Sequence, residues 1–197
     1  MKSRGGLYAC ILNRGNLRLA CWKAARGKRD RPAVRSFCAN LETNLAALAD
    51  AIVDGTAPTH DYTTFTIHDP KERRICAPSF VDRVVHHAIM NVCEAEFERS
   101  HIADTYACRT GKGQFAALER ARHFAARHSW YLKLDVRKYF ESIPKVTLCE
   151  AIDRKFRETR VARLFRSIVF GHTPDSPIGL PIGSLTSQHL ANFYLGR

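Results

Sequence analysis

Hydrophobic positions along the chain follow two spacings, and each spacing predicts a different element. Apolar residues recur every three to four positions in four stretches, which predicts a helix in each. These stretches are 16–25, 41–52, 82–93 and 114–127. Strict alternation over 62–68 and an extended run over 73–77 predict two strands joined by a turn at 69–72. The chain is therefore expected to contain a basic β-hairpin between helices.

A third alternating stretch, 130–136, predicts a strand that carries a carboxylate at its end. Its apolar positions 130, 132, 134 and 136 alternate with positions 131, 133 and 135, so one face is hydrophobic and the other ends in Asp135. A strand-end Asp next to Arg137 and Lys138 is suited to hold a metal ion and a phosphate chain. The alternative is a strand that ends in a solvated turn and has no further role.

Two helices are expected at 145–157 and 159–170, followed by a glycine-containing loop. Gly179, Pro181 and Gly183 predict a tight turn, and Ser184 is suited to cap the helix that follows. A glycine loop before a helix start lets the backbone approach a ligand closely. The expected fold class is therefore α/β or, more specifically, α+β: a helix-rich chain with a short antiparallel sheet.

The charge of the chain favours a polyanionic partner. Its 31 Lys and Arg against 19 Asp and Glu give a net charge of +12, and an excess of this size is typical of nucleic-acid binding. Two basic stretches are candidate phosphate contacts, although each is also compatible with a solvated loop. The candidate residues are Lys23, Arg26, Lys28, Arg29, Arg109 and Lys112.

Several classes of function are disfavoured by what the sequence lacks. The seven cysteines contain no Cys-x-x-Cys pair, which argues against a zinc ribbon or a disulfide framework and favours a reducing, cytoplasmic location. No apolar run is long enough to span a bilayer, so no membrane partner is expected. The Gly111–Gly113 stretch does not match the spacing of a phosphate-binding Walker loop. His86 and His87 are adjacent and point apart on a helix, so they do not suggest a zinc pair.

Two long motifs in order resemble those of bacterial reverse transcriptases. The stretch 134–143, Leu-Asp-Val-Arg-Lys-Tyr-Phe-Glu-Ser-Ile, is similar to motif A of that family, and 179–195 is similar to motif B. The segments 74–89 and 106–118 look like the fingers regions that precede motif A. The resemblance covers most of the chain, from about residue 16 to the end. It implies an RNA-directed DNA polymerase that adds dNTPs to a primer 3′-hydroxyl.

The resemblance also implies roles for individual residues. Asp135, with the carbonyl of Val136, would bind the catalytic Mg²⁺ ions, with Mn²⁺ as an alternative. Phe140 would lie beneath the sugar of the incoming nucleotide. The remaining dNTP contacts would come from Lys71, Arg74, Gly179, Pro181, Ile182 and Gly183. Of the two cations, Arg74 matches the family pattern better than Lys71.

One departure from the common pattern indicates a subfamily. Many reverse transcriptases have Gln where this sequence has Ile182, and Ile-Gly-x-x-x-Ser-Gln resembles the enzymes of diversity-generating retroelements. That subfamily implies low fidelity, especially opposite template adenines, and a small basic accessory protein as a further partner. Group II intron or retron enzymes remain an alternative, and so does a non-catalytic remnant that only binds nucleic acid.

The expected organisation is a basic helical extension at 1–60, fingers at 61–129 and a partial palm at 130–197. The family's motif C, an aromatic-x-Asp-Asp hairpin, and the thumb do not occur in these 197 residues. One aspartate cannot complete the oxygen shells of two Mg²⁺ ions, so this chain alone is expected to be inactive. Its expected partners are an RNA template, a DNA primer or RNA/DNA hybrid, and dNTPs.

Overall fold

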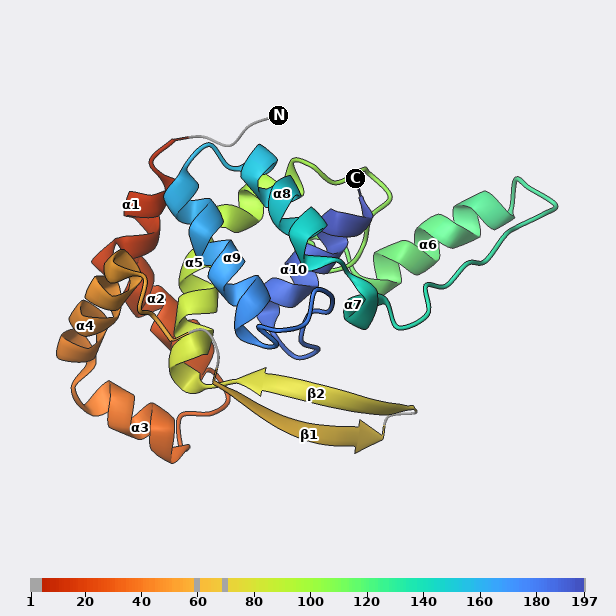
Figure 1. Cartoon of the computed structure of the whole chain (residues 1–197). Helices are drawn as coiled ribbons and strands as arrows, with labels where there is room; N and C mark the ends of the chain where they lie inside the picture. Colours follow the sequence, from red (N-terminus) through yellow and green to blue (C-terminus); the bar gives the residue numbers. More distant parts are fainter. Residues whose placement is uncertain (1–4, 59–60, 69–70, 197) are drawn as a thin grey trace.

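A computed structural model of the chain describes residues 5–58, 61–68 and 71–196. The fold is α+β, with many helices around one small antiparallel sheet (Figure 1). The N-terminal helices are α1 (Leu7–Leu12), α2 (Arg14–Ala25), α3 (Pro32–Ala39) and α4 (Leu41–Asp54). The middle of the chain forms β1 (Tyr62–His68), β2 (Glu72–Pro78), α5 (Phe80–Glu98) and α6 (Gln114–Ala125). The last elements are α7 (Tyr139–Ser142), α8 (Lys145–Lys155), α9 (Thr159–Gly171) and α10 (Leu185–Leu195).

Helix α5 is the centre of the fold. It begins at Ser79, whose hydroxyl accepts a hydrogen bond from the Asp82 amide at 3.3 Å, so one otherwise unpaired helix amide is satisfied. Helices α1, α2 and α10 pack against it. At its C-terminal end the Phe97 ring meets Phe156, Phe165 and Phe193 edge-on, with centroid separations of 5.5, 5.5 and 5.2 Å. This aromatic cluster joins α5 to α8, α9 and α10 in one core.

The predicted hairpin is confirmed. Strands β1 and β2 pair antiparallel from Tyr62 opposite Pro78 to His68 opposite Glu72. Of the predicted turn, Asp69 and Pro70 lie outside the described residues. The hairpin projects from the helices as a long ribbon (Figure 1).

The predicted strand at 130–136 is wrong. These residues are extended but have no strand partner within the described part of the chain, and they form a long loop that returns from α6 (Figure 1). Their side chains are largely exposed, Trp130 at 91% and Leu134 at 82%. A β-strand needs a neighbour to satisfy its backbone groups, and alternation alone does not supply one.

The basic stretch after α2 is not a loop throughout, because it runs into helix α3. Pro32 occupies the start of α3, where its fixed φ and missing amide suit a helix N-terminus. Helix α1 was not predicted, and it buries Leu7, Tyr8 and Ile11. One hydrophobic core runs through the three predicted segments, whose division stays a prediction. None of the helices in the described residues is long and apolar enough to cross a bilayer.

Candidate functional site

The glycine loop 179–183 is fixed by backbone hydrogen bonds to two other parts of the chain. The Leu180 amide donates to the Phe140 carbonyl at 2.8 Å, and the Gly179 amide donates to the Ile143 carbonyl at 2.9 Å. On the other side, the Cys76 amide of β2 donates to the Ile182 carbonyl at 2.7 Å. The loop therefore lies between α7 and the outer edge of the hairpin, in a defined conformation.

Gly183 is required by this arrangement. Its φ of 116° lies in the region that favours glycine. A Cβ atom there would also lie 2.8 Å from Ile75 Cγ2 and 3.2 Å from the Cys76 carbonyl oxygen. The structure shows a close approach of this backbone to strand β2, and the predicted approach to a ligand stays a prediction.

Ser184, the residue after the glycine loop, forms a hydrogen bond with a buried histidine. His86 of α5 is 1% exposed, and its Nδ1 lies 3.1 Å from the Ser184 hydroxyl. Ser184 stands at the N-cap position of α10, but its side chain makes no cap hydrogen bond. It contacts His86 and the Thr186 hydroxyl, the latter at 3.0 Å. Burial lowers the pKa of His86 to about 3, so the ring is neutral near neutral pH.

A hollow of ≈ 600 Å³ opens between the hairpin, α7 and the glycine loop. Three residues predicted as nucleotide contacts line it: Arg74 from β2, and Pro181 and Ile182 from the loop. The wall is completed by the side chains of Tyr62, Thr64, Cys76, Glu141, His172, Thr173 and Leu180. The structure thus brings together residues more than a hundred positions apart in the sequence.

Charges of both signs line the hollow, since the Arg74 guanidinium and the Glu141 carboxylate both belong to its wall. The Lys145 ammonium donates to the Thr173 carbonyl and hydroxyl oxygens at 2.5 and 2.8 Å, behind one wall. Burial, then Lys145 and Arg74, lower the pKa of His172, which is the response expected near cations. Tyr62 packs against the His172 ring at a centroid distance of 4.9 Å. The arrangement can bind an anion such as a phosphate group.

Other predicted nucleotide contacts lie away from this lining. Lys71 is exposed at the far end of the hairpin, and Phe140 is half-buried and packed on the core. Phe140 reaches the glycine loop through its carbonyl. Asp135 and Val136 are exposed in the loop between α6 and α7. Their roles remain predictions.

The described residues do not form a divalent-cation site in this conformation. No group of three or more His, Cys, Asp or Glu side chains within them could hold a metal ion. Asp135 offers a single carboxylate on an exposed, unpaired segment. Mg²⁺ and Mn²⁺ prefer several oxygen ligands, so these residues by themselves do not fit the expected metal.

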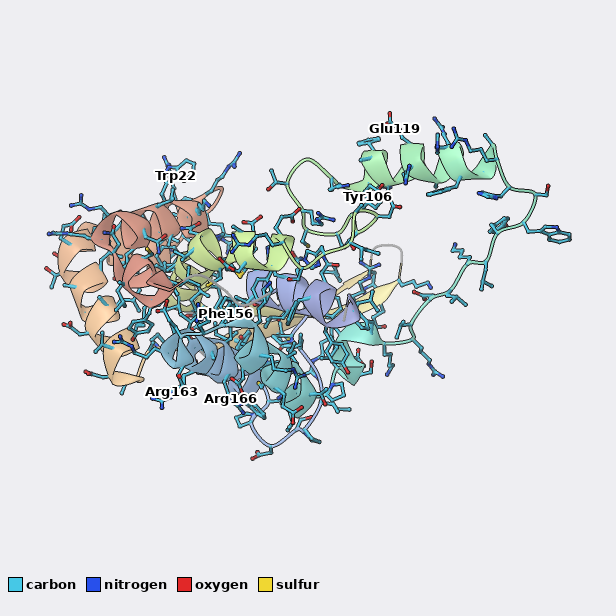
Figure 2. All side chains as sticks on the ribbon, turned by 90° about the horizontal axis from the view of Figure 1, so that it is seen from above. Trp22, Tyr106, Glu119, Phe156, Arg163 and Arg166 are labelled. Atoms are coloured by element: carbon cyan, nitrogen blue, oxygen red, sulfur yellow. The ribbon has the colours of Figure 1, made fainter. Side chains whose placement is uncertain are left out.

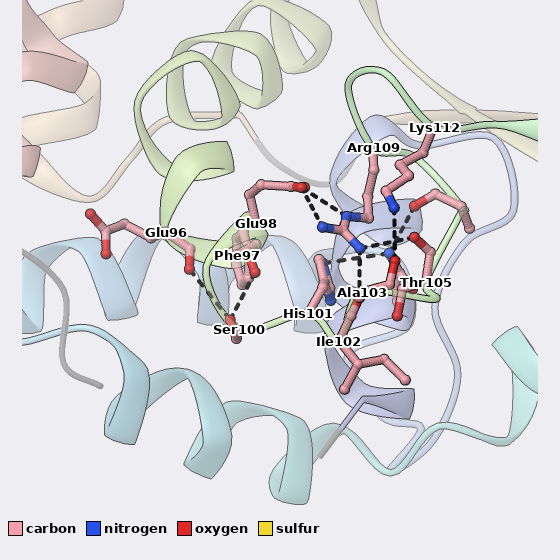
Figure 3. A network of polar contacts seen from close by, with 12 residues as sticks. Glu96, Phe97, Glu98, Ser100, His101, Ile102, Ala103, Thr105, Arg109 and Lys112 are labelled. Carbon is pink, nitrogen blue, oxygen red and sulfur yellow. Dashed lines mark hydrogen bonds and ion pairs between the residues drawn. The ribbon is translucent and has the colours of Figure 1, made fainter. Parts of the chain in front are cut away.

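The predicted nucleic-acid contacts differ in how free their side chains are. Lys23, Arg26, Lys28 and Arg29 are exposed on and after α2, and the Lys23 ammonium donates to Asn91 at 2.5 Å. The Arg109 side chain is only 9% exposed and binds Glu98 Oε1 through two nitrogens, at 2.8 and 2.6 Å. It also donates to the carbonyls of residues 102 and 105 (Figure 3).

Lys112 has a similar position. Its ammonium donates to the Ala103 carbonyl at 2.8 Å (Figure 3). It also lies 4.9 Å from the centroid of the Tyr106 ring. Both cations therefore stabilise the loop 98–112, and a nucleic-acid role for them stays a prediction.

The residues of this site that sequence reasoning missed include His86, Tyr62, Glu141 and His172. One signal was available for His86, because it lies within the apolar face formed by Val84, Val85, Ala88 and Ile89. A polar side chain on such a face needs a buried partner. The other three become neighbours only through tertiary contacts.

Comparison with known proteins gives two sequence relatives. The chain is 22% identical over 163 residues to the group II intron-encoded protein LtrA of Lactococcus lactis subsp. cremoris, across 78% of this chain and 27% of that protein. It is 27% identical over 120 residues to an uncharacterized 91 kDa protein in the cob intron of Schizosaccharomyces pombe, across 58% of this chain and 15% of that protein. The chain thus spans at most about a quarter of the length of these relatives. No family model matches it.

Among solved structures, the fold resembles part of a Cas6-RT-Cas1--Cas2 complex. In the partial complex the TM-score is 0.56 at 16% identity, over 96% of this chain and 34% of that chain. A second structure of the complex gives the same TM-score, and there the aligned region covers 21% of the matched chain. The likeness shows that this chain shares the fold of a segment of those larger proteins.

Proposed function

We propose that this chain is a segment of a bacterial reverse transcriptase, comprising fingers and the first part of the palm of an RNA-directed DNA polymerase. The observation that carries the proposal is the convergence of Arg74, Pro181 and Ile182 on one hollow. Arg74 precedes motif A in the sequence and the other two belong to motif B. The similarity to an intron-encoded protein and to an RT-containing complex supports the same function.

In this proposal the hollow accepts the incoming dNTP. The Arg74 guanidinium would bind the triphosphate, for which its planar fork of donors is suited. The rigid loop 179–183 would support the nucleotide from below, because its backbone is already fixed before a ligand arrives. Asp135 would contribute one carboxylate to the magnesium site that the resemblance implies.

RNA-templated extension of a DNA primer tests the proposal directly. The full-length gene product, with Mg²⁺ and four dNTPs, is expected to extend the primer, and Asp135→Asn is expected to abolish extension. Asp50→Asn on the exposed side of α4 is the matched control and should retain activity. The isolated 197 residues are proposed to be inactive, since the resemblance requires an aromatic-x-Asp-Asp segment that they do not contain. Extension by those residues alone would contradict this part.

The proposal has two versions, which differ in the type of retroelement that encodes the enzyme. Ile182 in the hollow favours a diversity-generating retroelement, because an aliphatic side chain cannot make the polar contacts of an amide. The similarity to a group II intron-encoded protein favours an intron enzyme instead. Adenine error rates of the wild-type product and its Ile182→Gln variant distinguish them. Equal error rates would contradict the low-fidelity version and leave the intron enzyme.

A further inference from the structure

A row of exposed arginines covers the outer face of α9 and the end of α8. Residues 153–166 contain six Lys and Arg but only two carboxylates. Figure 2 places Arg163 and Arg166 on the side of the molecule opposite Trp22 of α2. This surface is thus distinct from the basic stretch after α2. Its exposed members are Arg154, Arg157, Arg160, Arg163 and Arg166.

The two carboxylates of this stretch do little to neutralise the surface. Glu158 accepts hydrogen bonds from the Leu7 and Tyr8 amides at 2.7 and 2.9 Å, so it is directed at the start of α1. Asp153 pairs with Arg166, at 2.8 Å. Within the described part of the chain Arg154 and Arg163 make no hydrogen bond or ion pair with a protein group. A net positive surface remains.

The surface is concave, which an ordinary solvated helix face is not. A groove of ≈ 540 Å³ is lined by Arg157, Arg163 and Arg166, with Phe156 and Thr159 among its other residues. Arg160, beside it, has its guanidinium 4.5 Å from the Tyr8 ring centroid. The exposed cations around the groove are all arginines, whose planar donors bind phosphate bidentately where lysine acts as a point charge.

We propose that this arginine groove binds the sugar-phosphate backbone of a nucleic-acid strand, at a second site apart from the nucleotide hollow. The identity of the polyanion rests on the proposed function; the groove and its charge do not. The groove has room for a phosphate with part of its sugar, and successive arginines along α9 can follow successive phosphates. Recognition of this kind is independent of base sequence.

Fluorescence anisotropy with a labelled RNA strand tests the proposal, measured on the full chain over a range of KCl concentrations. The triple variant Arg157→Gln/Arg163→Gln/Arg166→Gln is expected to weaken binding at least about tenfold and to lower the salt slope by about 2, as for loss of two to three phosphate contacts. The control is Arg14→Gln/Arg18→Gln/Arg35→Gln on α2 and α3, which removes the same charge elsewhere. It is expected to change the slope by less than half as much. Far-ultraviolet circular dichroism verifies that both variants fold.

Several outcomes would overturn the proposal. Equal effects of the two triple variants would mean that only net charge matters, and no effect would mean that the groove is a solvated face. Displacement of RNA by inorganic phosphate or ATP as readily as by unlabelled RNA would mean a small-anion site. Binding to anionic vesicles that is lost in the groove variant, with RNA binding kept, would mean a membrane surface. RNA binding is measured without DNA synthesis. The result for the arginine groove can therefore be interpreted even if primer extension fails.

Discussion

The glycine loop 179–183 and the extended segment 130–136 contrast sharply, although both belong to motifs that the sequence identifies. The loop accepts a hydrogen bond from β2 and donates hydrogen bonds to α7 and to the segment after α7. The segment has exposed apolar side chains and no paired strand within the described residues. The two motifs therefore differ in how many contacts they make within the described residues. We expect the loop to be the more rigid of the two and the segment, which has no paired strand among the described residues, to open more readily.

The largest expected effect comes from breaking the loop. Gly183→Ala should destabilise the fold by about 3 kcal/mol, because the new Cβ meets Ile75 and the backbone has a positive φ. Gly27→Ala is the control: it has a φ of 71° but nothing within 4 Å of an added Cβ. It should cost about 1 kcal/mol from backbone strain alone. Urea unfolding measures both, and equal losses would contradict the tight contact between the loop and β2.

The histidine that anchors Ser184 predicts a pH dependence. The pKa of His86 is about 3 in the folded state against an ordinary 6.5, so the unfolded state takes up a proton first as the pH falls. Stability is therefore fully present above pH 6.5 and lost as the pH decreases towards 3, by at most about 1.4 kcal/mol per unit. Between pH 6.5 and 5 the loss of stability from this group is less than about 2 kcal/mol.

This prediction is checked by measuring the free energy of unfolding of the wild type and of His86→Gln at pH 6.5 and at pH 5. His87, whose pKa is lowered by burial, Lys23 and Arg83, is present in both proteins. The difference between them therefore isolates His86. Parallel stability losses in the two proteins would show that His86 is not the buried neutral group described.

The role of Arg74 in the hollow predicts an effect on nucleotide binding. Arg74→Ala should raise the KM for dNTP about tenfold in the full-length product, since a charge-assisted phosphate contact contributes about 1.5–3 kcal/mol. Arg73 is the matched control, because neighbouring strand residues face opposite sides and Arg73 does not line the hollow. Arg73→Ala should leave KM within about twofold. Equal effects of the two substitutions would remove the hollow as the dNTP site.

The smallest effect is expected in the extended segment. Leu134→Ala should change stability by less than about 0.5 kcal/mol, because the side chain is 82% exposed. Leu190→Ala on α10, where the side chain is 0% exposed, should cost about 2–5 kcal/mol. A substantial loss at Leu134 would mean that the segment is packed in solution.

Local patterns predicted the elements whose contacts are local. The hairpin, α4 and α5 follow from alternation and helical spacing. The strand at 130–136 did not, because a ladder depends on a partner that local alternation does not reveal. Helix α1 was missed for a related reason: its amides meet Glu158, about 150 residues away.

The sequence predicted which residues belong to the site better than it predicted which groups those residues contact. Arg74 and Ile182 were identified and do line one hollow. Arg109 was identified only by its charge, whereas the structure shows its donors occupied by Glu98 and two carbonyls. Which acceptors surround a cation depends on tertiary packing, so charge alone could not separate Arg109 from the exposed Arg29.

Hydrogen exchange of the backbone amides tests the contrast between the two motifs most directly. The amides of Cys76, Gly179 and Leu180, which donate to carbonyls on neighbouring segments, should exchange slowly, near the rate set by global unfolding. Amides 131–136 should exchange at close to the rate of an unstructured peptide. Protection across 131–136 in this chain alone would contradict the account, because it would mean that the segment already has a strand partner.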